Sequence, residues 1–155
     1  LRTRRQRQMC IRDSFQTDEA LVQANGEKLS SAIENVLRNA IRYTPSNSSI
    51  NESLKVENLE KATERAINED KYNSLSYKLV IEDNGPGIPE QDIDNIFEPF
   101  FRVDSARNHK TGGYGIGLAI AKKVISQHDG TIQAKNTGSG LAVSICLPSA
   151  NVSMS

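Results

Sequence analysis

The 155-residue sequence has few cysteines, no excess of either charge and no long hydrophobic run. Two cysteines, Cys10 and Cys146, are too few for a disulfide framework and match no metal-ligand spacing, which favours a reducing, cytoplasmic setting. Nineteen basic and nineteen acidic side chains balance, which excludes a generally basic nucleic-acid-binding protein and a strongly acidic disordered chain. No apolar run approaches the ~18 residues of a membrane-spanning helix, and the pattern of a secretion signal is absent.

The balanced charge hides an uneven distribution along the chain. Residues 1–12 carry five arginines and no acid, so the rest of the chain is acidic by five charges. Residues 1–19 lack apolar periodicity and are interpreted as a linker stub or a non-domain segment, with a nucleic-acid or membrane-surface arm as the alternative. The length fits one domain, placed at residues 20–150, with a short tail at 151–155. Because the chain begins with Leu1 rather than Met, we expect a piece of a longer protein.

The pattern of apolar residues predicts an alternation of helices and strands. Helices are expected at 27–43, at 59–67 (weakly), between Pro89 and Pro99, and at 117–128, and strands near 50–56 and at 78–83, 131–136 and 141–147. This order is satisfied by an α+β fold in which helices cover one face of a mostly antiparallel sheet.

The first candidate site lies on the first predicted helix. Asn35, Asn39, Arg42 and Tyr43 fall within an arc of about 100° beside its apolar stripe. An Asn carboxamide oxygen suits Mg²⁺ beside a polyphosphate, an Arg can hold a phosphate, and a Tyr can stack on a base. The alternative is a solvated helix face, which this patch by itself favours.

The second candidate is the turn Asp83-Asn84-Gly85-Pro86-Gly87, which follows a predicted strand. A carboxylate at the strand end that accepts from an exocyclic amine selects adenine over guanine, and the glycines let the backbone curve around the ligand. A plain Asp-Asn-Gly turn explains the same residues.

The third candidate is the run from Ile96 to Arg102, which holds three of the four phenylalanines. We expect Phe97 and one neighbour to fill the core, while the run as a whole anchors the next loop or contacts a partner. Arg102 and Arg107 are candidates to meet phosphate charge.

The fourth candidate is the glycine-rich start of the helix at 117–128. Closely spaced glycines before a helix permit the backbone approach and the helix-dipole contact that a phosphate needs. The dinucleotide-binding spacing fails because Leu118 stands where its last glycine belongs, and the Gly-Lys-Ser/Thr of a P-loop is absent. A flexible connector is the alternative.

Together, the order and spacing of the four patches resemble the ATP-binding catalytic domain of bacterial sensor histidine kinases. That domain belongs to a superfamily shared with type II topoisomerases, mismatch-repair ATPases and ATP-driven chaperones. The resemblance covers residues 20–148 and implies a two-layer sandwich, a mixed sheet under helices, that binds ATP and Mg²⁺ beneath a lid at 102–113.

The resemblance also implies a role for each matching position. Asn39 would ligate Mg²⁺ with Asn35 beside it, Arg42 would contact phosphate where the family commonly has Lys, Tyr43 would pack on the adenine, and Asp83 would read its amino group. The remaining matches are the pocket glycines Gly85 and Gly87, the aromatic-box residues Phe97 and Phe100, the phosphate-side Arg102 and Arg107, and the lid-closing Gly113, Gly115, Gly117 and Leu118.

The implied reaction is transfer of the ATP γ-phosphoryl group to a histidine on a separate dimerisation domain, and then to a response regulator receiver domain. Glu34 or Asn35 would orient the acceptor imidazole. Because His109 and His128 match no phosphoacceptor pattern, the chain alone is expected to bind ATP without phosphorylating itself. It is expected to be the cytoplasmic domain of an inner-membrane kinase, reaching the membrane only through the missing sensor part and binding no nucleic acid.

Two alternatives to this function remain open. One is a serine-protein kinase of the anti-sigma-factor type, which has the same fold and lacks a fused dimerisation domain. The other is a non-catalytic nucleotide-binding module, although no motif position is lost. The segment 47–77 departs from the family because it is long and polar, and it is expected to be a solvent-exposed insertion.

Overall fold

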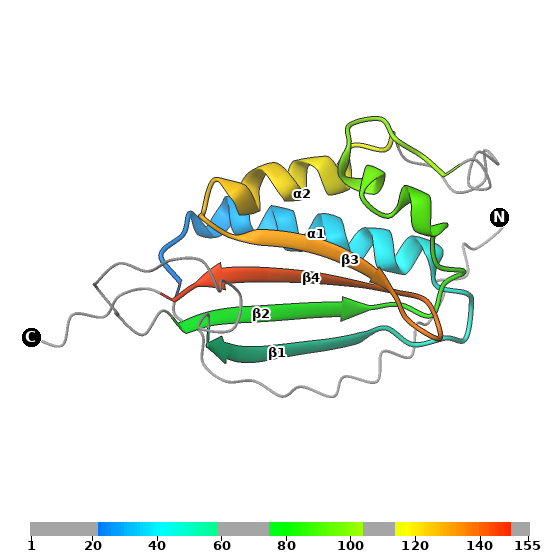
Figure 1. Ribbon diagram of the computed structural model, residues 1–155, viewed down its shortest axis with the longest axis horizontal. Coiled ribbons are helices and arrows are strands. Elements are labelled where there is room, and N and C mark those ends of the chain that lie inside the picture. The colour runs from blue at the N-terminus through cyan, green and yellow to red at the C-terminus, as the bar shows by residue number, and fades with distance from the viewer. Residues whose placement is uncertain (1–21, 59–74, 104–113, 150–155) are drawn as a thin grey trace, which may run out of the picture.

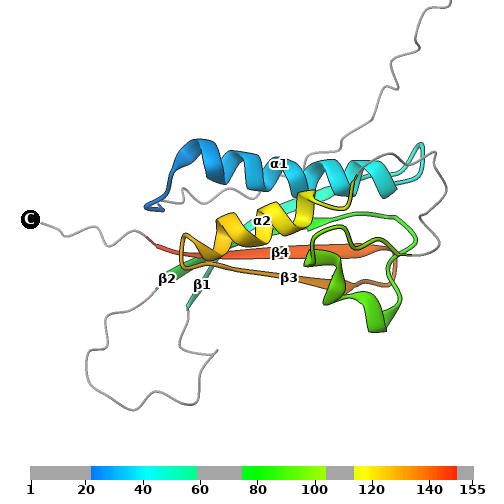
Figure 2. The same ribbon diagram turned by 90° about the horizontal axis from the view of Figure 1, so that it is seen from above.

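The computed structural model describes residues 22–58, 75–103 and 114–149, which form two layers (Figure 1). The four strands pair antiparallel in the order β1-β2-β4-β3, and two helices lie side by side over one face (Figure 2). The elements are α1 (Gly26–Tyr43), β1 (Asn51–Asn58), β2 (Leu75–Glu82), the 3-10 turns η2 (Glu90–Asp92) and η3 (Asn95–Phe97), α2 (Gly117–Ser126), β3 (Thr131–Asn136) and β4 (Leu141–Pro148). This confirms the expected two-layer α+β fold, with only antiparallel pairs among the described strands.

The boundaries of α1 follow from local capping. The Asn25 side chain accepts a hydrogen bond from the Lys28 N–H at 3.0 Å, which satisfies one of the free donors of the first turn. At the other end the Thr44 backbone N–H and hydroxyl both donate to the Ala40 carbonyl, and Pro45 prevents a further turn. Between these ends, helical spacing brings one stripe into the core, namely Ala32, Val36 and Ala40.

Alternation along β4 builds the other half of the core. Its buried residues are separated by half-buried ones on the opposite face, as a period of two requires for a sheet covered on one side. The inward side chains belong to Leu141, Val143, Ile145 and Leu147, and they form one cluster with the buried residues Leu118, Ala121 and Ile125 of α2. This shared core fixes α2, and therefore the glycines before it, against the sheet.

The short helix expected between Pro89 and Pro99 is instead two 3-10 turns. Asp92 N–H donates to the Pro89 carbonyl at 2.8 Å and Glu98 N–H to the Asn95 carbonyl at 2.9 Å, each three residues back. A segment this short would form too few hydrogen bonds to carbonyls four residues back to offset the free-energy cost of nucleating an α-helix. The apolar side chains that suggested a helix are still used, because Ile96 and Phe97 are buried.

The segment 47–77 is less of an insertion than its polar composition indicates. Its first part is β1, which pairs along its whole length with β2, and β2 begins at Leu75 rather than Lys78. The polar residues of these strands alternate with inward ones such as Leu54 and Leu79, which face each other across the pair. The weak helix expected at 59–67 lies outside the described residues.

Several expectations fall on residues that the structure does not describe, namely the N-terminal segment, the C-terminal tail and most of the lid at 102–113. The second long helix ends at Ser126, slightly before the expected His128. Among the described helices, none is both long and apolar enough to cross a membrane.

Candidate nucleotide-binding site

The elements that carry the candidate residues meet at one end of the domain. The last turns of α1, the end of β2, the β3–β4 turn and the beginning of α2 all lie at this end (Figure 1). A cavity of about 780 Å³ opens there, which is within the usual size of a small-molecule site. Its lining brings together most of the predicted residues, namely Asn35, Asn39, Arg42, Tyr43, Asp83, Gly87, Arg102, Gly115, Gly117 and Leu118.

One wall of the cavity is the polar side of α1. Asn35 and Asn39 are one turn apart and half-buried, and they line the cavity beside the buried stripe of the same helix. The beginning of α2 approaches this wall closely, because a Cβ on Gly117 would lie 3.6 Å from the Asn35 side-chain oxygen. Two carboxamides and the N-terminus of a ten-residue helix therefore lie close together in the cavity, and Arg42, two turns beyond Asn35 on α1, also lines it.

Asp83 lies at another part of the cavity and is almost completely buried, with 4% of its surface exposed. Its Oδ1 atom accepts hydrogen bonds from the Gly85 N–H at 2.8 Å and the Leu141 N–H at 3.2 Å. Its own N–H donates to the Leu141 carbonyl at 2.9 Å. Because no other described residue bonds to this side chain, Oδ2 is left to accept from a ligand in the cavity.

Burial raises the pKa of Asp83 above its ordinary value of 3.8, and the charge of Glu82 acts in the same direction, while the hydrogen bonds from Gly85 and Leu141 lower it. The folded chain therefore takes up this proton more readily than the unfolded chain. The stabilising effect of that proton is fully present below the ordinary pKa and is lost as pH rises through the raised one. At neutral pH Asp83 is thus a buried charge that lowers stability, as expected of a group kept for binding.

The β3–β4 turn packs directly against Asp83. Gly140 begins the return into β4, and a Cβ at this position would lie 2.0 Å from the Asp83 carbonyl oxygen and 2.9 Å from Oδ1. Only glycine permits this approach. The turn is held by Thr137, whose N–H donates to the Gly140 carbonyl and whose hydroxyl accepts from the Gly140 N–H. The position of the Asp83 carboxylate is therefore set by the hydrogen bonds from Gly85 and Leu141 and by the close approach of Gly140.

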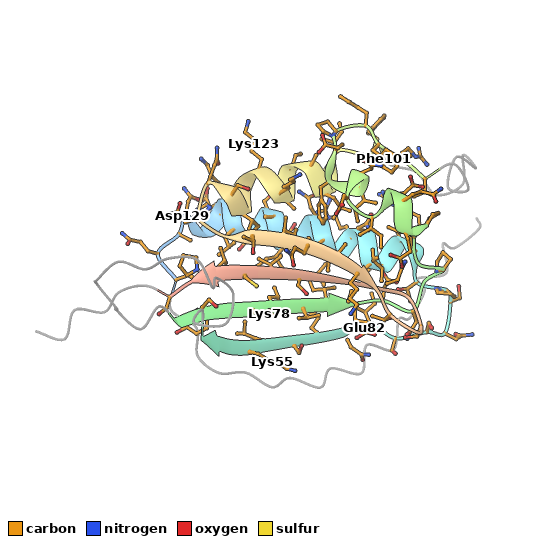
Figure 3. The ribbon with its side chains drawn as sticks, in the orientation of Figure 1. Lys55, Lys78, Glu82, Phe101, Lys123 and Asp129 are labelled. Carbon is orange, nitrogen blue, oxygen red and sulfur yellow. The ribbon has the colours of Figure 1, made fainter. Side chains whose placement is uncertain are left out.

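Of the three phenylalanines in the run from Ile96 to Arg102, Phe97 and one neighbour fill the core as expected, and only Phe100 differs from the expectation. Phe97 is buried in the core, but Phe100, expected in the aromatic box, is 73% exposed with a left-handed φ of 66°. Phe101 lines the cavity and packs against the core. Figure 3 shows Phe101 at the end of the domain where α2 begins, far from Asp129 at the opposite end. The unusual backbone at Phe100 turns one ring outward and the next inward.

Some predicted residues lie outside the cavity lining. Glu34 is exposed on α1 and forms a 3.4 Å ion pair with Arg38. Gly85 does not line the cavity but donates its N–H to Asp83. Arg107 and Gly113 are outside the described residues. His128 accepts from the Asn25 N–H at 3.1 Å and lies 2.7 Å from the Val124 carbonyl, so it links the ends of two helices away from the cavity.

Other lining residues were not predicted. Arg38 is the main polar residue among them. It lies three residues after Asn35 and four before Arg42, and this helical spacing indicates that all three lie on one side of α1. Tyr114 is 85% exposed and carries no such signal. The apolar lining comes from Ile88, Ile96, Ile116, Ile120 and Leu141, together with Pro86, Phe101 and Val103.

The fold and the site together define a nucleotide-binding α+β domain. Residues 24–151 match the family model described as histidine kinase-, DNA gyrase B-, and HSP90-like ATPase. The chain belongs to this family of ATP-binding domains. Its relatives are sensor histidine kinases, so it is a catalytic domain of the histidine kinase type.

Two curated relatives and two solved structures illustrate the likeness. The chain is 34% identical over 128 residues to the sensor histidine kinase WalK of Bacillus subtilis, covering 82% of the chain and 19% of that protein. It is 36% identical over 123 residues to the sensor protein kinase WalK of Staphylococcus aureus, covering 79% of this chain and 26% of that protein. The mycobacterial sensor histidine kinase MprB superposes with a TM-score of 0.70 at 30% identity, covering 90% of this chain and 84% of that one. The catalytic domain of histidine kinase ThkA gives 0.62 at 25% identity, covering 88% and 78%.

Proposed function

We propose that this domain binds Mg²⁺-ATP and transfers the γ-phosphoryl group to a histidine on a separate helical dimerisation domain, for relay to a response regulator. The observation that carries the proposal is one cavity with a buried carboxylate in one part, paired carboxamides and a helix N-terminus in another, and an arginine in its lining. The first set suits an adenine amino group and the second a polyphosphate. Since the chain spans about a fifth of the Bacillus subtilis relative, the acceptor and the regulator would be supplied by other domains or proteins.

The base is proposed to bind at Asp83. Oδ2 would accept from the exocyclic amine of adenine, whereas guanine presents a carbonyl oxygen at that position and would be repelled by the carboxylate. Tyr43 lies at the end of α1, lines the same cavity, and would pack its ring on the base. The 4% exposure of Asp83 excludes most water from this hydrogen bond, which strengthens its contribution to selectivity.

The donor set on α1 fits a magnesium ion bound together with phosphate oxygens. Neutral amide oxygens are hard ligands, and Mg²⁺ typically takes one or two protein oxygens while substrate phosphates and water complete its shell. Asn39, with Asn35 one turn away, would hold it, and its positive charge would offset the charge of the phosphates. Arg42 and the N–H groups at the start of α2 would position the phosphates.

Glu34 and Asn35 are proposed to orient the acceptor histidine. Glu34 is exposed and precedes Asn35 directly, so an incoming helix can reach its carboxylate without entering the cavity. A carboxylate that accepts from one imidazole nitrogen turns the other toward the phosphate, which is the kind of positioning that phosphoryl transfer requires. We further propose that the domain acts on the cytoplasmic side of a membrane sensor, of which it would be the catalytic part; the relatives are named as sensor kinases.

The chain mixed with a dimerisation domain that carries an acceptor histidine is expected to transfer label from γ-labelled ATP to that domain in trans. The linkage should be labile in acid and stable in alkali, as phosphohistidine is. Acid-stable label on a partner serine would instead support the anti-sigma-factor type of kinase. Normal ATP binding with no transfer to either acceptor would support a non-catalytic module.

Asn39→Ala is expected to lower ATP affinity at least about tenfold in the presence of Mg²⁺, because an ion ligand is lost. In EDTA the variant and the parent chain should bind ATP equally. Titration calorimetry in both buffers measures the difference. Ser30→Ala, at an exposed position outside the cavity on the same helix, is the matched control. Equal Mg²⁺ dependence in Asn39→Ala and the parent chain would contradict the assignment.

A further inference from the structure

Asn136, the last residue of β3, forms a two-way hydrogen bond with the backbone of a distant loop. Its Oδ1 accepts from the Ile88 N–H at 2.9 Å, and its Nδ2 donates to the Ile88 carbonyl at 2.6 Å. The same Nδ2 also donates to the Glu90 carboxylate at 3.0 Å. One carboxamide thus pairs with both backbone groups of one residue, as a neighbouring strand does.

The loop held in this way is part of the cavity wall. Gly87 and Ile88 both line the cavity, whereas Asn136 does not. Gly87 has a left-handed φ of 70°, and a Cβ on it would lie 2.9 Å from the Asn136 Oδ1 atom. The loop backbone therefore rests directly on the Asn136 carboxamide.

We propose that Asn136 is a positioning residue for nucleotide binding, because it holds the Gly87–Ile88 wall in place around the base before the ligand arrives. The proposal rests on binding of adenine nucleotides in this cavity, as set out above. Residues 83–89 lie between β2 and η2 and have no strand partner of their own beyond the Asp83–Leu141 contact. Without Asn136, the Ile88 N–H and carbonyl lose their partner. The free-energy cost of ordering the loop then falls on ligand binding and lowers the affinity.

The chemistry of the contact requires an amide. An aspartate keeps an acceptor for the Ile88 N–H but sets a second oxygen against the Ile88 carbonyl and the Glu90 carboxylate, where Asn136 now donates. We therefore expect Asn136→Asp to disturb the loop more than Asn136→Ala, which leaves space for water. Adding Glu90→Gln to Asn136→Asp supplies an amide donor to the new carboxylate and should restore part of the loss.

Asn136→Ala is expected to lower the affinity for adenosine and for ATP by the same factor, about tenfold, while the affinity for inorganic triphosphate with Mg²⁺ stays unchanged. General loss of structure would weaken all three ligands together. Calorimetry measures the affinities, and amide hydrogen exchange of Ile88 should become faster in the variant. Gln133→Ala replaces an exposed amide on the same strand and is the matched control, for which the affinities for all three ligands should stay unchanged.

Each outcome decides between the proposals. Adenosine binding by Asn136→Ala equal to that of the parent chain would overturn the positioning role alone, and so would an equal loss for triphosphate. A parent chain that binds neither adenosine nor ATP would overturn the proposed function, and this inference with it. If Asn136→Ala fails to fold, Asn136→Ser takes its place, because a hydroxyl can replace at most one of the two bonds to Ile88. Adenosine affinity of Asn136→Ser equal to that of the parent chain would then contradict the proposal.

Discussion

Asp83→Asn is expected to lower ATP affinity about 10- to 100-fold and to remove the preference for ATP over GTP. In the variant, the amide oxygen can still accept from the Gly85 and Leu141 N–H groups, so the amide NH₂ takes the place of Oδ2. A donor then faces the donating amine of adenine. Loss of a hydrogen bond to a buried charged group is worth roughly 1.5–3 kcal/mol, which corresponds to the expected range in affinity.

Stability separates this effect from unfolding. Removing a buried charge should leave the free energy of unfolding at neutral pH equal or higher in Asp83→Asn, because the raised pKa marks a charge that folding disfavours. For the parent chain, adenosine affinity should fall as pH is lowered through that raised pKa, and the fall should be smaller in Asp83→Asn, where only protonation of the adenine N1 atom contributes. Adenosine is the suitable ligand because it has no titrating phosphate. Unchanged ATP-over-GTP preference in the variant would exclude Asp83 as the base-reading group.

Gly140→Ala is expected to destabilise the domain by about 1–3 kcal/mol and to weaken ATP binding as well. The added methyl group would overlap the Asp83 carbonyl oxygen, at 2.0 Å, so the turn or the end of β2 must move. Movement at this point displaces the carboxylate, since Leu141 next to Gly140 is one of its donors. Urea denaturation and calorimetry measure the two losses.

Gly138→Ala is the matched control, because it lies in the same turn and a Cβ there would have no atom within 4 Å. It should change stability by no more than about 0.5 kcal/mol and leave affinity unchanged. Equal effects of the two substitutions would show that the turn, rather than the contact with Asp83, is responsible.

Elements with a long, regular pattern were predictable from the sequence. The apolar spacing of α1 and the stop at Pro45 gave its bounds nearly to the residue, and the alternation along β4 marked its inward face. The segment between Pro89 and Pro99 was predicted wrongly because its few apolar residues fit a helix and a pair of 3-10 turns equally well. The strand expected near 50–56 was found at Asn51–Asn58, whereas the first three residues of β2, Leu75 to Tyr77, were missed because polar residues interrupt the apolar ones there.

For the candidate site, the motif residues were predictable, but the residues that position them were not. Asn136 and Gly140 act on backbone atoms of residues about fifty positions away, and no local pattern reports a contact of that kind. Which of Phe100 and Phe101 faces inward depends on one left-handed backbone angle, which composition does not indicate. Sequence reasoning therefore finds the atoms that touch a ligand more readily than the packing that places them.

The contact between the β3–β4 turn and the end of β2 also sets an order of events during synthesis. Leu141 donates a hydrogen bond to Asp83, and Asn136 bonds to Ile88. The pocket around Asp83 therefore needs residues that are synthesised about fifty positions later than the loop they contact. A nascent chain that has not yet released residues 136–141 from the ribosome possesses α1 and the Asp83 loop but no complete site. A nucleotide that binds at Asp83 would then stabilise only a chain in which β4 has already paired in the sheet.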